Sequence, residues 1–173
     1  MRLEWSGYKA IVPYFIQKQG KFMSQFIPKD PSFKNKVKES FYRQEVMNTI
    51  GAKPTLIEPG HVELEFKYDN KLTQQHGFIH AGIVSTVLDS ACGYAAFSLM
   101  SENMAVLTIE FKVNLFSPAK GEVFIAIGKV KKAGKTIIVS DGELYAINEG
   151  ERKLVATITC TLMSIPNREG LEG

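Results

Sequence analysis

A long apolar segment that contains a single charge constrains the fold of this chain more than any other feature. Between Lys71 and Glu102 the one formally charged residue is Asp89. The surrounding residues 77–100 read as one long helix that is mostly buried. Burial of a carboxylate is costly unless the group is paired, neutralised or used in chemistry. Asp89 is therefore the best single indicator of function in the sequence.

Residues 77–100 are also long enough to suggest a membrane span. However, Asp89, four Ser or Thr hydroxyls and three glycines interrupt the segment. The strands predicted on both sides have the pattern of a water-soluble domain. We interpret the segment as the buried helix of a globular domain, and the 173 residues fit one domain with an elaboration at one end.

The composition excludes several function classes. A formal net charge of +3 is too small to predict a nucleic-acid partner. The two cysteines, Cys92 and Cys160, lie in apolar stretches without metal-ligand spacing, and three histidines are too few for a multi-histidine metal site. We therefore expect no metal and no cofactor. Reduced core cysteines, and an N-terminus that lacks a secretory signal, favour a cytoplasmic protein.

Residues 1–38 form a basic extension that differs from the rest of the chain. Residues 1–54 hold ten Lys or Arg against four Asp or Glu. Aromatic and aliphatic residues recur among the basic ones, so the segment is amphipathic. We interpret residues 1–38 as an extension packed on its own domain or on a partner subunit. An arm that lies on an anionic membrane surface is the alternative.

Hydrophobic periodicity divides residues 39–165 into the elements of one domain. Residues 39–50 read as a short helix that ends at Gly51. From residue 56 apolar residues alternate with polar ones, which predicts strands. Residues 166–173 read as a flexible tail. The predicted strands are residues 62–68, 107–115, 121–131, 135–147 and 152–165, with short glycine-containing turns between the last three.

The order of these elements predicts the fold. It runs helix, strand, long helix and then four antiparallel strands. One apolar helix followed by a meander is best buried when the sheet wraps around the helix. Small residues such as Ala91, Gly93 and Ala95 allow a sheet to approach this helix closely. The sequence thus predicts an α+β hotdog fold, with an antiparallel sheet wrapped around a long central helix and an N-terminal helical extension.

Two stretches resemble the PaaI-type acyl-CoA thioesterases, and the likeness covers most of the predicted domain. Residues 74–89 are similar to the family signature, in which His-Gly-Gly opens the central helix and an Asp or Glu follows two turns later. Residues 108–119 resemble the strand after that helix. This chain has Ala81-Gly82 in place of Gly-Gly, and Gln74 in place of the Asn of many members. The resemblance implies hydrolysis of an acyl-CoA to a free acid and CoA.

The chemistry of thioester hydrolysis explains why these residue types are needed. The charge that grows on the carbonyl oxygen needs a hydrogen-bond donor, and a helix N-terminus offers unpaired N–H groups and a favourable dipole. We expect the Ala81 N–H to polarise the carbonyl, with Gly82 beside the substrate. Attack on the carbonyl carbon needs a carboxylate nucleophile or a water that a carboxylate deprotonates. Asp89 is the candidate for both roles.

The spacing of the two groups predicts an oligomer. Eight helical residues separate Ala81 from Asp89, a rise of about 12 Å, which is too far for both to contact one thioester. If both act, they come from different subunits, so we expect a homodimer or a dimer of dimers. The resemblance further implies that Gln74 and Thr108 help to place water or substrate. We expect His80 to shape the loop.

Other interpretations stay open at this point. Asp89 is a structural carboxylate if it is tied to the backbone or to Ser85. A hydratase or dehydratase of acyl thioesters would pair His80 with Asp89 across two chains. A non-catalytic acyl-CoA-binding module would use the same pocket, and residues 1–38 would then contact a membrane. The acyl specificity is open as well. Tyr94, Phe97 and Met100 are candidates to line the pocket or pack elsewhere, and their apolar character favours medium or long aliphatic, or aromatic, acyl groups.

Overall fold

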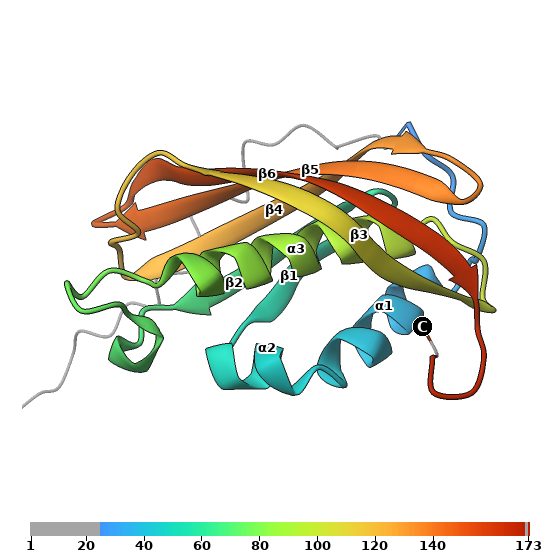
Figure 1. The fold of residues 1–173 in the computed structure, drawn as a ribbon, viewed down its shortest axis with the longest axis horizontal. Helices are drawn as coiled ribbons and strands as arrows, with labels where there is room; N and C mark the ends of the chain where they lie inside the picture. The colour runs from blue at the N-terminus through green and yellow to red at the C-terminus, as the bar shows by residue number, and fades with distance from the viewer. Residues whose placement is uncertain (1–24, 172) are drawn as a thin grey trace, which may run out of the picture.

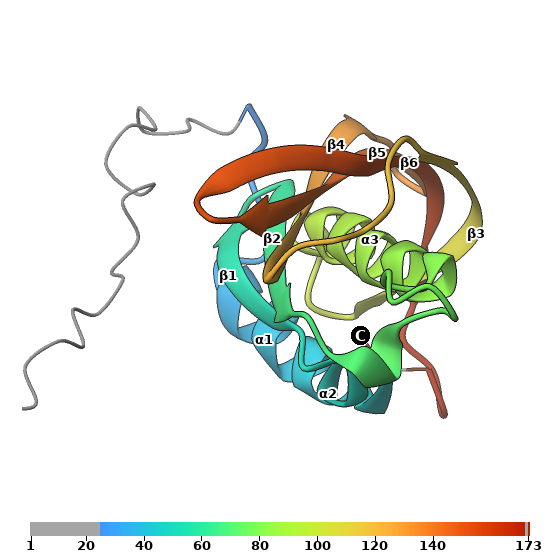
Figure 2. The same ribbon diagram turned by 90° about the vertical axis from the view of Figure 1, so that its left-hand side faces the viewer.

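The chain folds as a six-stranded antiparallel sheet that curls around one long helix (Figure 1). The structure is a computed structural model that describes residues 25–171 and 173. Helix α3 runs along the concave face of the sheet, and helices α1 and α2 lie on its open side (Figures 1 and 2). This arrangement confirms the predicted architecture. The helices are α1 (Phe33–Tyr42), α2 (Glu45–Ile50) and α3 (Ala81–Phe97), with a 3₁₀ turn at Asn70–Leu72, and the strands are β1 (Lys53–Glu58), β2 (His61–Lys67), β3 (Met104–Leu115), β4 (Val123–Ala133), β5 (Ile137–Asn148) and β6 (Glu151–Pro166).

The strands follow the order β1-β2-β4-β5-β6-β3 across the sheet. Strands β4, β5 and β6 form the predicted hairpins, and the turn after β5 uses Glu149 and Gly150 with φ values of 50° and 82°. The prediction of four strands in one meander is wrong for β3, which pairs with β6 at the far edge. Because β3 follows a helix that spans the concave face, the chain re-enters the sheet at the opposite edge.

A pair of glycines allows the sheet to touch the backbone of α3. Gly128 on β4 pairs with Gly142 on β5. A Cβ at Gly128 would lie 2.3 Å from the carbonyl carbon of Ala91, and one at Gly142 would lie 2.9 Å from the Cys92 sulfur. The sheet therefore approaches the helix at two small, fully buried residues. Asp89 lies two residues before Ala91, about 200° around the helix, so this contact leaves the face with Asp89 more open.

The long helix is shorter than predicted at both ends. α3 begins at Ala81 and not at residue 77, because Gly77 has a left-handed φ of 78° and His80 has extended backbone. It ends at Phe97, with Ser98 as its C-cap. None of the helices in the described part of the chain is long and apolar enough to cross a membrane.

The prediction of one helix over residues 39–50 is wrong, because two helices meet at an elbow formed by Arg43 and Gln44. The break has a packing reason. Phe41 in α1 and Met47 in α2 both lie in the core, yet on one continuous helix residues six apart would point about 120° apart. Extended backbone at Gln44, with φ of −80° and ψ of 102°, brings both side chains into the core.

The described part of the predicted N-terminal extension is packed against its own domain. Lys36 of α1 donates to the carbonyl oxygens of Met100 and Ser101, at 2.7 and 3.2 Å, just after α3. The same ammonium pairs with the buried carboxylate of Asp30 at 3.2 Å. Residues 1–24 lie outside the described residues, so a membrane-binding arm stays a prediction.

Strand β1 lies at an edge of the sheet, and our reading of the sequence does not predict it. Pro54 lies inside the strand, and the register of β1 against β2 shifts between Pro54 and Leu56. Proline lacks a backbone donor, so it is tolerated on edge strands and at bulges. The same proline obscures the strand in the sequence.

The last residues of the chain turn back toward the helices. Strand β6 ends at Pro166, and Arg168 then pairs with Leu171. The Arg43 guanidinium donates to the Gly173 carbonyl oxygen at 2.5 Å. The flexibility predicted for residues 166–173 stays a prediction, but their described part reaches the cavity beside Asp89.

Candidate active site

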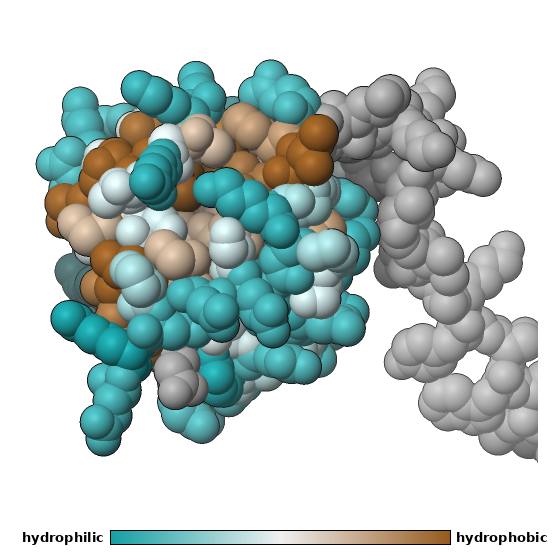
Figure 3. All heavy atoms as spheres, turned by 90° about the vertical axis from the view of Figure 1, so that its right-hand side faces the viewer, coloured by the Kyte–Doolittle hydropathy of each residue, from teal (hydrophilic) through white to brown (hydrophobic). Residues whose placement is uncertain are grey.

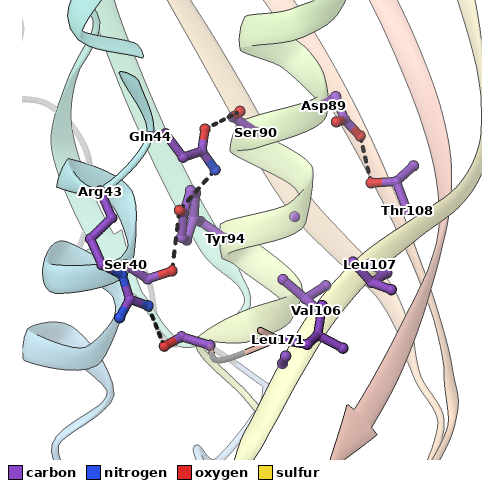
Figure 4. Close-up of a pocket in the computed structure, with 13 residues that line it drawn as sticks. Ser40, Arg43, Gln44, Asp89, Ser90, Tyr94, Val106, Leu107, Thr108 and Leu171 are labelled. Carbon is purple, nitrogen blue, oxygen red and sulfur yellow. Dashed lines mark hydrogen bonds between the residues drawn. The ribbon is translucent and has the colours of Figure 1, made fainter. Parts of the chain in front are cut away.

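A cavity of about 410 Å³ lies between α3, the start of β3 and the elbow that joins α1 to α2 (Figure 4). Cavities of this size hold small ligands. Its polar lining residues are Ser40, Arg43 and Gln44 around the elbow, Asp89, Ser90 and Tyr94 on α3, and Thr108 on β3.

One hydrogen bond orients Asp89 at this cavity. The Thr108 hydroxyl donates to Asp89 Oδ1 at 2.8 Å (Figure 4). The pairing of β3 with β6 shifts register between Thr108 and Glu110. Burial raises the pKa of the Asp89 carboxyl above its ordinary value, and the bond from Thr108 partly offsets that shift because it favours the ionised form. A carboxylate with a raised pKa is a better proton acceptor than an exposed one, which suits a general base.

The contacts of Asp89 do not support a purely structural role. Ser85, considered above as a tether, donates instead to the Ala81 carbonyl oxygen at 2.9 Å. Among the described residues Thr108 is the hydrogen-bond partner of Asp89, and no Lys or Arg forms an ion pair with it. Buried polar groups are normally fully partnered. Asp89 therefore keeps acceptor capacity for a ligand or a water.

A second cavity, of about 490 Å³, lies at the N-terminal end of α3. Gln74 and Ala81 line it together with mostly apolar residues. Ala81 is the first residue of α3, and within the described part of the chain its N–H has no hydrogen-bond partner. The helix dipole adds partial positive charge at this end. A carbonyl oxygen in this cavity would find a free donor. The apolar lining residues are Phe78, Ile79, Val84, Leu115, Phe116, Pro118, Ala119 and Val155.

His80 caps α3, which supports its predicted role in shaping the loop. Its Nδ1 accepts a hydrogen bond from the Gly82 N–H at 2.9 Å, and its own N–H donates to the Leu72 carbonyl oxygen at 2.9 Å. The Gly82 N–H is thus occupied and cannot donate to a substrate at the same time. A Cβ at Gly82 would lie 3.1 Å from His80 Nδ1. Gly82 therefore serves the cap through its lack of a side chain.

Gln74 closes the loop that precedes α3. Its Oε1 accepts from the His76 N–H, and its own N–H donates to the Phe78 carbonyl oxygen at 2.9 Å. The Tyr68 hydroxyl holds the same loop through the Gly77 carbonyl oxygen at 3.1 Å. These bonds place Gln74 against the second cavity, where its side-chain NH₂ group remains as a donor.

The two cavities are separate halves. They share no lining residue. The fold brings Gln74 and His80 to Ala81, and it brings Thr108 to Asp89. The residues around Ala81 and those around Asp89 stay apart, because Ala81 and Asp89 are separated by about 12 Å along α3. Within one chain, the free N–H and the carboxylate cannot contact one thioester.

Strand β3 carries exposed hydrophobic side chains at the edge of the sheet. Leu107, Ile109 and Phe111 expose 44%, 50% and 47% of their surface. β3 pairs with β6 on one side and has no strand on the other among the described residues. Hydrophobic residues gather on the left in Figure 3, the side of the molecule that bears β3. An apolar sheet edge of this kind is typical of an interface.

Our sequence reasoning missed the polar contacts on the other side of the first cavity. Gln44 Nε2 donates to the Tyr94 hydroxyl at 2.9 Å, and the Ser90 hydroxyl donates to Gln44 Oε1 at 3.4 Å (Figure 4). No Gly or Pro marks the break that turns Gln44 toward α3, so the sequence contains no local signal for it. The sequence does offer one indication that Ser90 belongs to the site, because Ser90 is next to Asp89 in an otherwise apolar helix.

The described residues around the two cavities do not favour metal-dependent or cysteine-based chemistry. Within the described part of the chain, no group of three or more His, Cys, Asp or Glu residues is placed to hold a metal ion. Cys92 and Cys160 are free thiols in the core. A hydrogen bond with Cys160, followed by burial, raises the pKa of the Cys92 thiol well above its ordinary value. A thiol held in its neutral form is a poor nucleophile.

Comparisons with known proteins point to one family. Residues 76–153 match the family model of the thioesterase superfamily. A thioesterase family protein from Silicibacter pomeroyi is 56% identical, with a TM-score of 0.77 over 78% of this chain and 99% of that protein. Human acyl-coenzyme A thioesterase 13 is 32% identical over 100 residues, which cover 57% of this chain and 69% of the relative. The PaaI protein of E. coli, at 18% identity, has the same fold, with a TM-score of 0.70 over 79% of this chain and 95% of that protein. These likenesses confirm the predicted hotdog fold.

Proposed function

The chain belongs to the thioesterase superfamily, and from this premise we propose that it hydrolyses an acyl-CoA thioester to a free carboxylic acid and CoA. One observation carries the proposal. Asp89 is a half-buried carboxylate with a raised pKa that lines a cavity, and it lies on the helix whose first N–H is free. The name of the human relative, an acyl-coenzyme A thioesterase, supports acyl-CoA as the substrate class.

We infer that each complete site combines two copies of the chain. The free N–H of Ala81 and the carboxylate of Asp89 lie at separate cavities, about 12 Å apart along the helix axis. In a symmetric dimer the first half of one copy meets the second half of the other, so two identical sites arise. The apolar edge of β3 supports such an assembly. A dimer and a dimer of dimers satisfy the argument equally.

In the proposed mechanism Asp89 acts as the general base. It takes a proton from a water that attacks the carbonyl carbon, while the Ala81 N–H of the other subunit binds the carbonyl oxygen as it gains charge. When the tetrahedral intermediate collapses, the C–S bond breaks and the CoA thiolate takes the proton from Asp89. Direct attack by the carboxylate, with an anhydride that water then opens, uses the same geometry and is the alternative.

The surrounding residues have supporting roles in this proposal. Thr108 orients Asp89 and tunes its pKa. Gln74 offers an amide donor near the carbonyl or the attacking water, and His80 holds the helix start through the Gly82 N–H. His80 Nδ1 is occupied by that bond, so a His–carboxylate pair of the kind used by a hydratase would have to use Nε2 together with Asp89 of a second copy.

The cytoplasmic location belongs to the same proposal. It rests on Cys92 and Cys160, which are free and buried. Disulfides are rare in the cytosol, where thiols stay reduced.

Replacement of Asp89 by Asn tests the proposed function. Thiol release from a panel of acyl-CoAs with graded chain length should fall by roughly 10²- to 10⁴-fold, because the general base is lost. Asp141→Asn is the matched control: Asp141 accepts a bond from Thr159 at 3.0 Å, as Asp89 does from Thr108, but lines neither cavity.

The stability of the variant separates lost chemistry from lost folding. Because burial raises the pKa of Asp89, its ionised form opposes folding at neutral pH, and that cost fades as the pH falls through this pKa. Asp89→Asn should therefore melt at or above the wild-type temperature at pH 7. Full activity of this variant on every acyl-CoA tried would sink the proposal, and tight binding without turnover by the wild type would favour an acyl-CoA-binding module.

A further inference from the structure

The cavity beside Asp89 continues along α3 past the carboxylate. Gly93 lies one helical turn after Asp89, on the same face of the helix, and lines the cavity. The residue is buried, yet a Cβ there would meet no atom within 4 Å. Glycine inside a helix is destabilising relative to alanine, and no close contact requires it here. Gly93 thus leaves open space next to the carboxylate.

Four uncharged polar side chains form a wall of this cavity, which we call the polar wall: Ser40, Gln44, Ser90 and Tyr94 (Figure 4). Gln44 Nε2 donates to the Tyr94 hydroxyl at 2.9 Å, and the hydroxyls of Ser40 and Tyr94 lie 3.3 Å apart. The Ser90 hydroxyl donates to Gln44 Oε1 at 3.4 Å. The wall therefore contains both donors and acceptors at the edge of an open space.

The packing of α1 on α3 holds the polar wall in place. The rings of Phe41 and Tyr94 pack with centroids 5.5 Å apart. Lys36 ties α1 to the end of α3 through two carbonyl oxygens. Arg43, the cation nearest to the wall in sequence, donates to the Gly173 carbonyl oxygen. Side chains whose positions are fixed in this way can discriminate between ligands.

The helix sets the offset between the reacting group and the wall. Tyr94 follows Asp89 by five residues, which is about 7.5 Å along the helix axis and about 140° around it. Gly93 lines the cavity between them, so an acyl group with its thioester at Asp89 has to pass over Gly93 to reach the Tyr94 hydroxyl. A six-carbon acyl chain is about as long as the axial part of this path.

We propose that the polar wall selects acyl groups that carry an uncharged hydrogen-bonding group, a hydroxyl or a carbonyl, near the far end of a chain of about six carbons, with Gly93 providing the passage. This inference rests on the proposed thioesterase activity. The wall groups already bond to one another, but Gln44 Nε2 has a second N–H and the hydroxyl oxygens have further acceptor capacity. A substrate hydroxyl or carbonyl can therefore gain a hydrogen bond at the wall that an alkyl end cannot make. Arg43 lines the same cavity, and its guanidinium donates to the Gly173 carbonyl oxygen. A preference for an acyl carboxylate would therefore indicate recognition by Arg43 and not by the uncharged wall.

Matched acyl-CoAs test the selection. The substrates are hexanoyl-CoA, 6-hydroxyhexanoyl-CoA and adipoyl-CoA, which differ at the end that reaches the wall. We expect kcat/KM of the wild type to favour the hydroxylated substrate by roughly three- to tenfold over each of the others, the range of one neutral hydrogen bond. Tyr94→Phe and Gln44→Met should each reduce this ratio toward one. Tyr42→Phe is the matched control, since Tyr42 is on α1 but lines neither cavity.

A second variant does not depend on the hydrogen bonds. Gly93→Leu should fill the passage, so hydrolysis of all three C6 substrates falls while acetyl-CoA, too short to reach Gly93, is affected much less. Gly93→Ala should stay folded, since alanine favours the helix and the space is open, and should show a smaller loss of the same pattern.

The outcomes separate this inference from the proposed function. Hydrolysis that requires Asp89 but shows no preference for the hydroxylated substrate, or prefers hexanoyl-CoA or adipoyl-CoA, overturns the inference alone. If no acyl-CoA is hydrolysed, the proposed function fails. Calorimetric titration with non-hydrolysable thioether analogues of hexanoyl- and 6-hydroxyhexanoyl-CoA then decides the inference: weaker binding of the hydroxyl analogue by Tyr94→Phe supports it, and equal binding refutes it.

Discussion

The two halves of the proposed site differ in how the chain builds them. In the donor half, the hydrogen bonds that position the Ala81 N–H join chiefly near neighbours within residues 72–82, while residues 115–119 and Val155 complete the wall of the cavity. The carboxylate half, around Asp89, needs α3, β3, the elbow after α1 and the end of the chain. The proposed oxyanion donor is therefore positioned largely by local bonds, whereas the proposed acyl recognition depends on tertiary contacts.

The largest effect is expected when the Ala81 N–H is removed while the loop before α3 stays intact. Ala81→Pro removes the N–H at the first position of α3, where proline is well tolerated. His80, with φ of −61° and ψ of 139°, already has the backbone that precedes proline. We expect kcat to fall by about 10²- to 10³-fold, the effect of losing one oxyanion donor, with little change in melting temperature.

Ala81→Ser is the control for this variant, because it changes the side chain and keeps the N–H. It should retain most of the activity in the same thiol-release assay. A proline variant that is folded and fully active would show that the carbonyl is activated elsewhere.

Mixing two inactive variants tests whether the halves come from different chains. In a mixed dimer of Ala81→Pro and Asp89→Asn subunits, one site carries both substitutions and the other carries neither. Random mixing after reversible dissociation should restore about a quarter of the wild-type activity. A site contained within one chain would give no recovery, so an inactive mixture whose mixed dimers are verified by mass spectrometry would refute the shared site.

The smallest expected effect concerns the tuning of the carboxylate half. Thr108→Val removes the hydrogen bond that lowers the pKa of Asp89, and burial then acts alone, so this pKa rises further. Because the ionised form is the base, the acidic limb of the kcat/KM profile should move to higher pH. Activity should drop a few-fold on that limb and change little above it. Thr108→Ser should keep the wild-type pH profile. If the acidic limb does not move in Thr108→Val, then Thr108 does not tune the pKa of the catalytic base as proposed.

Much of the site follows from local patterns. Asp89 is conspicuous because it is the lone charge of an apolar helix. The alternation of residues 62–68 correctly indicates a half-buried strand, and that of residues 107–115 indicates a strand, although most of its apolar side chains are exposed in the single chain. The cap at His80 is also local, because its ring accepts from an N–H two residues later. Such features depend on residues within a turn or two, so periodicity and spacing are enough to find them.

Other features have no local signature. The elbow at Gln44 exists because Phe41 and Met47 must both reach the core, which a single helix would not allow. The sequence around it reads as an uninterrupted helix, so the partnership of Gln44 with Tyr94 could not be predicted. The edge position of β3 likewise depends on where the chain leaves α3 relative to the sheet.

Local patterns in the sequence were enough to indicate the candidate carboxylate: Asp89 lies two turns after a helix start, in a chain whose element order buries that helix in a sheet. Which groups share a cavity with it follows from the tertiary structure. It joined Asp89 to Thr108 and to the polar wall, and it left the Ala81 N–H in a separate cavity. The physical reason is that hydrophobic period and helix capping act over a few residues, whereas the walls of a cavity come from segments that core packing brings together.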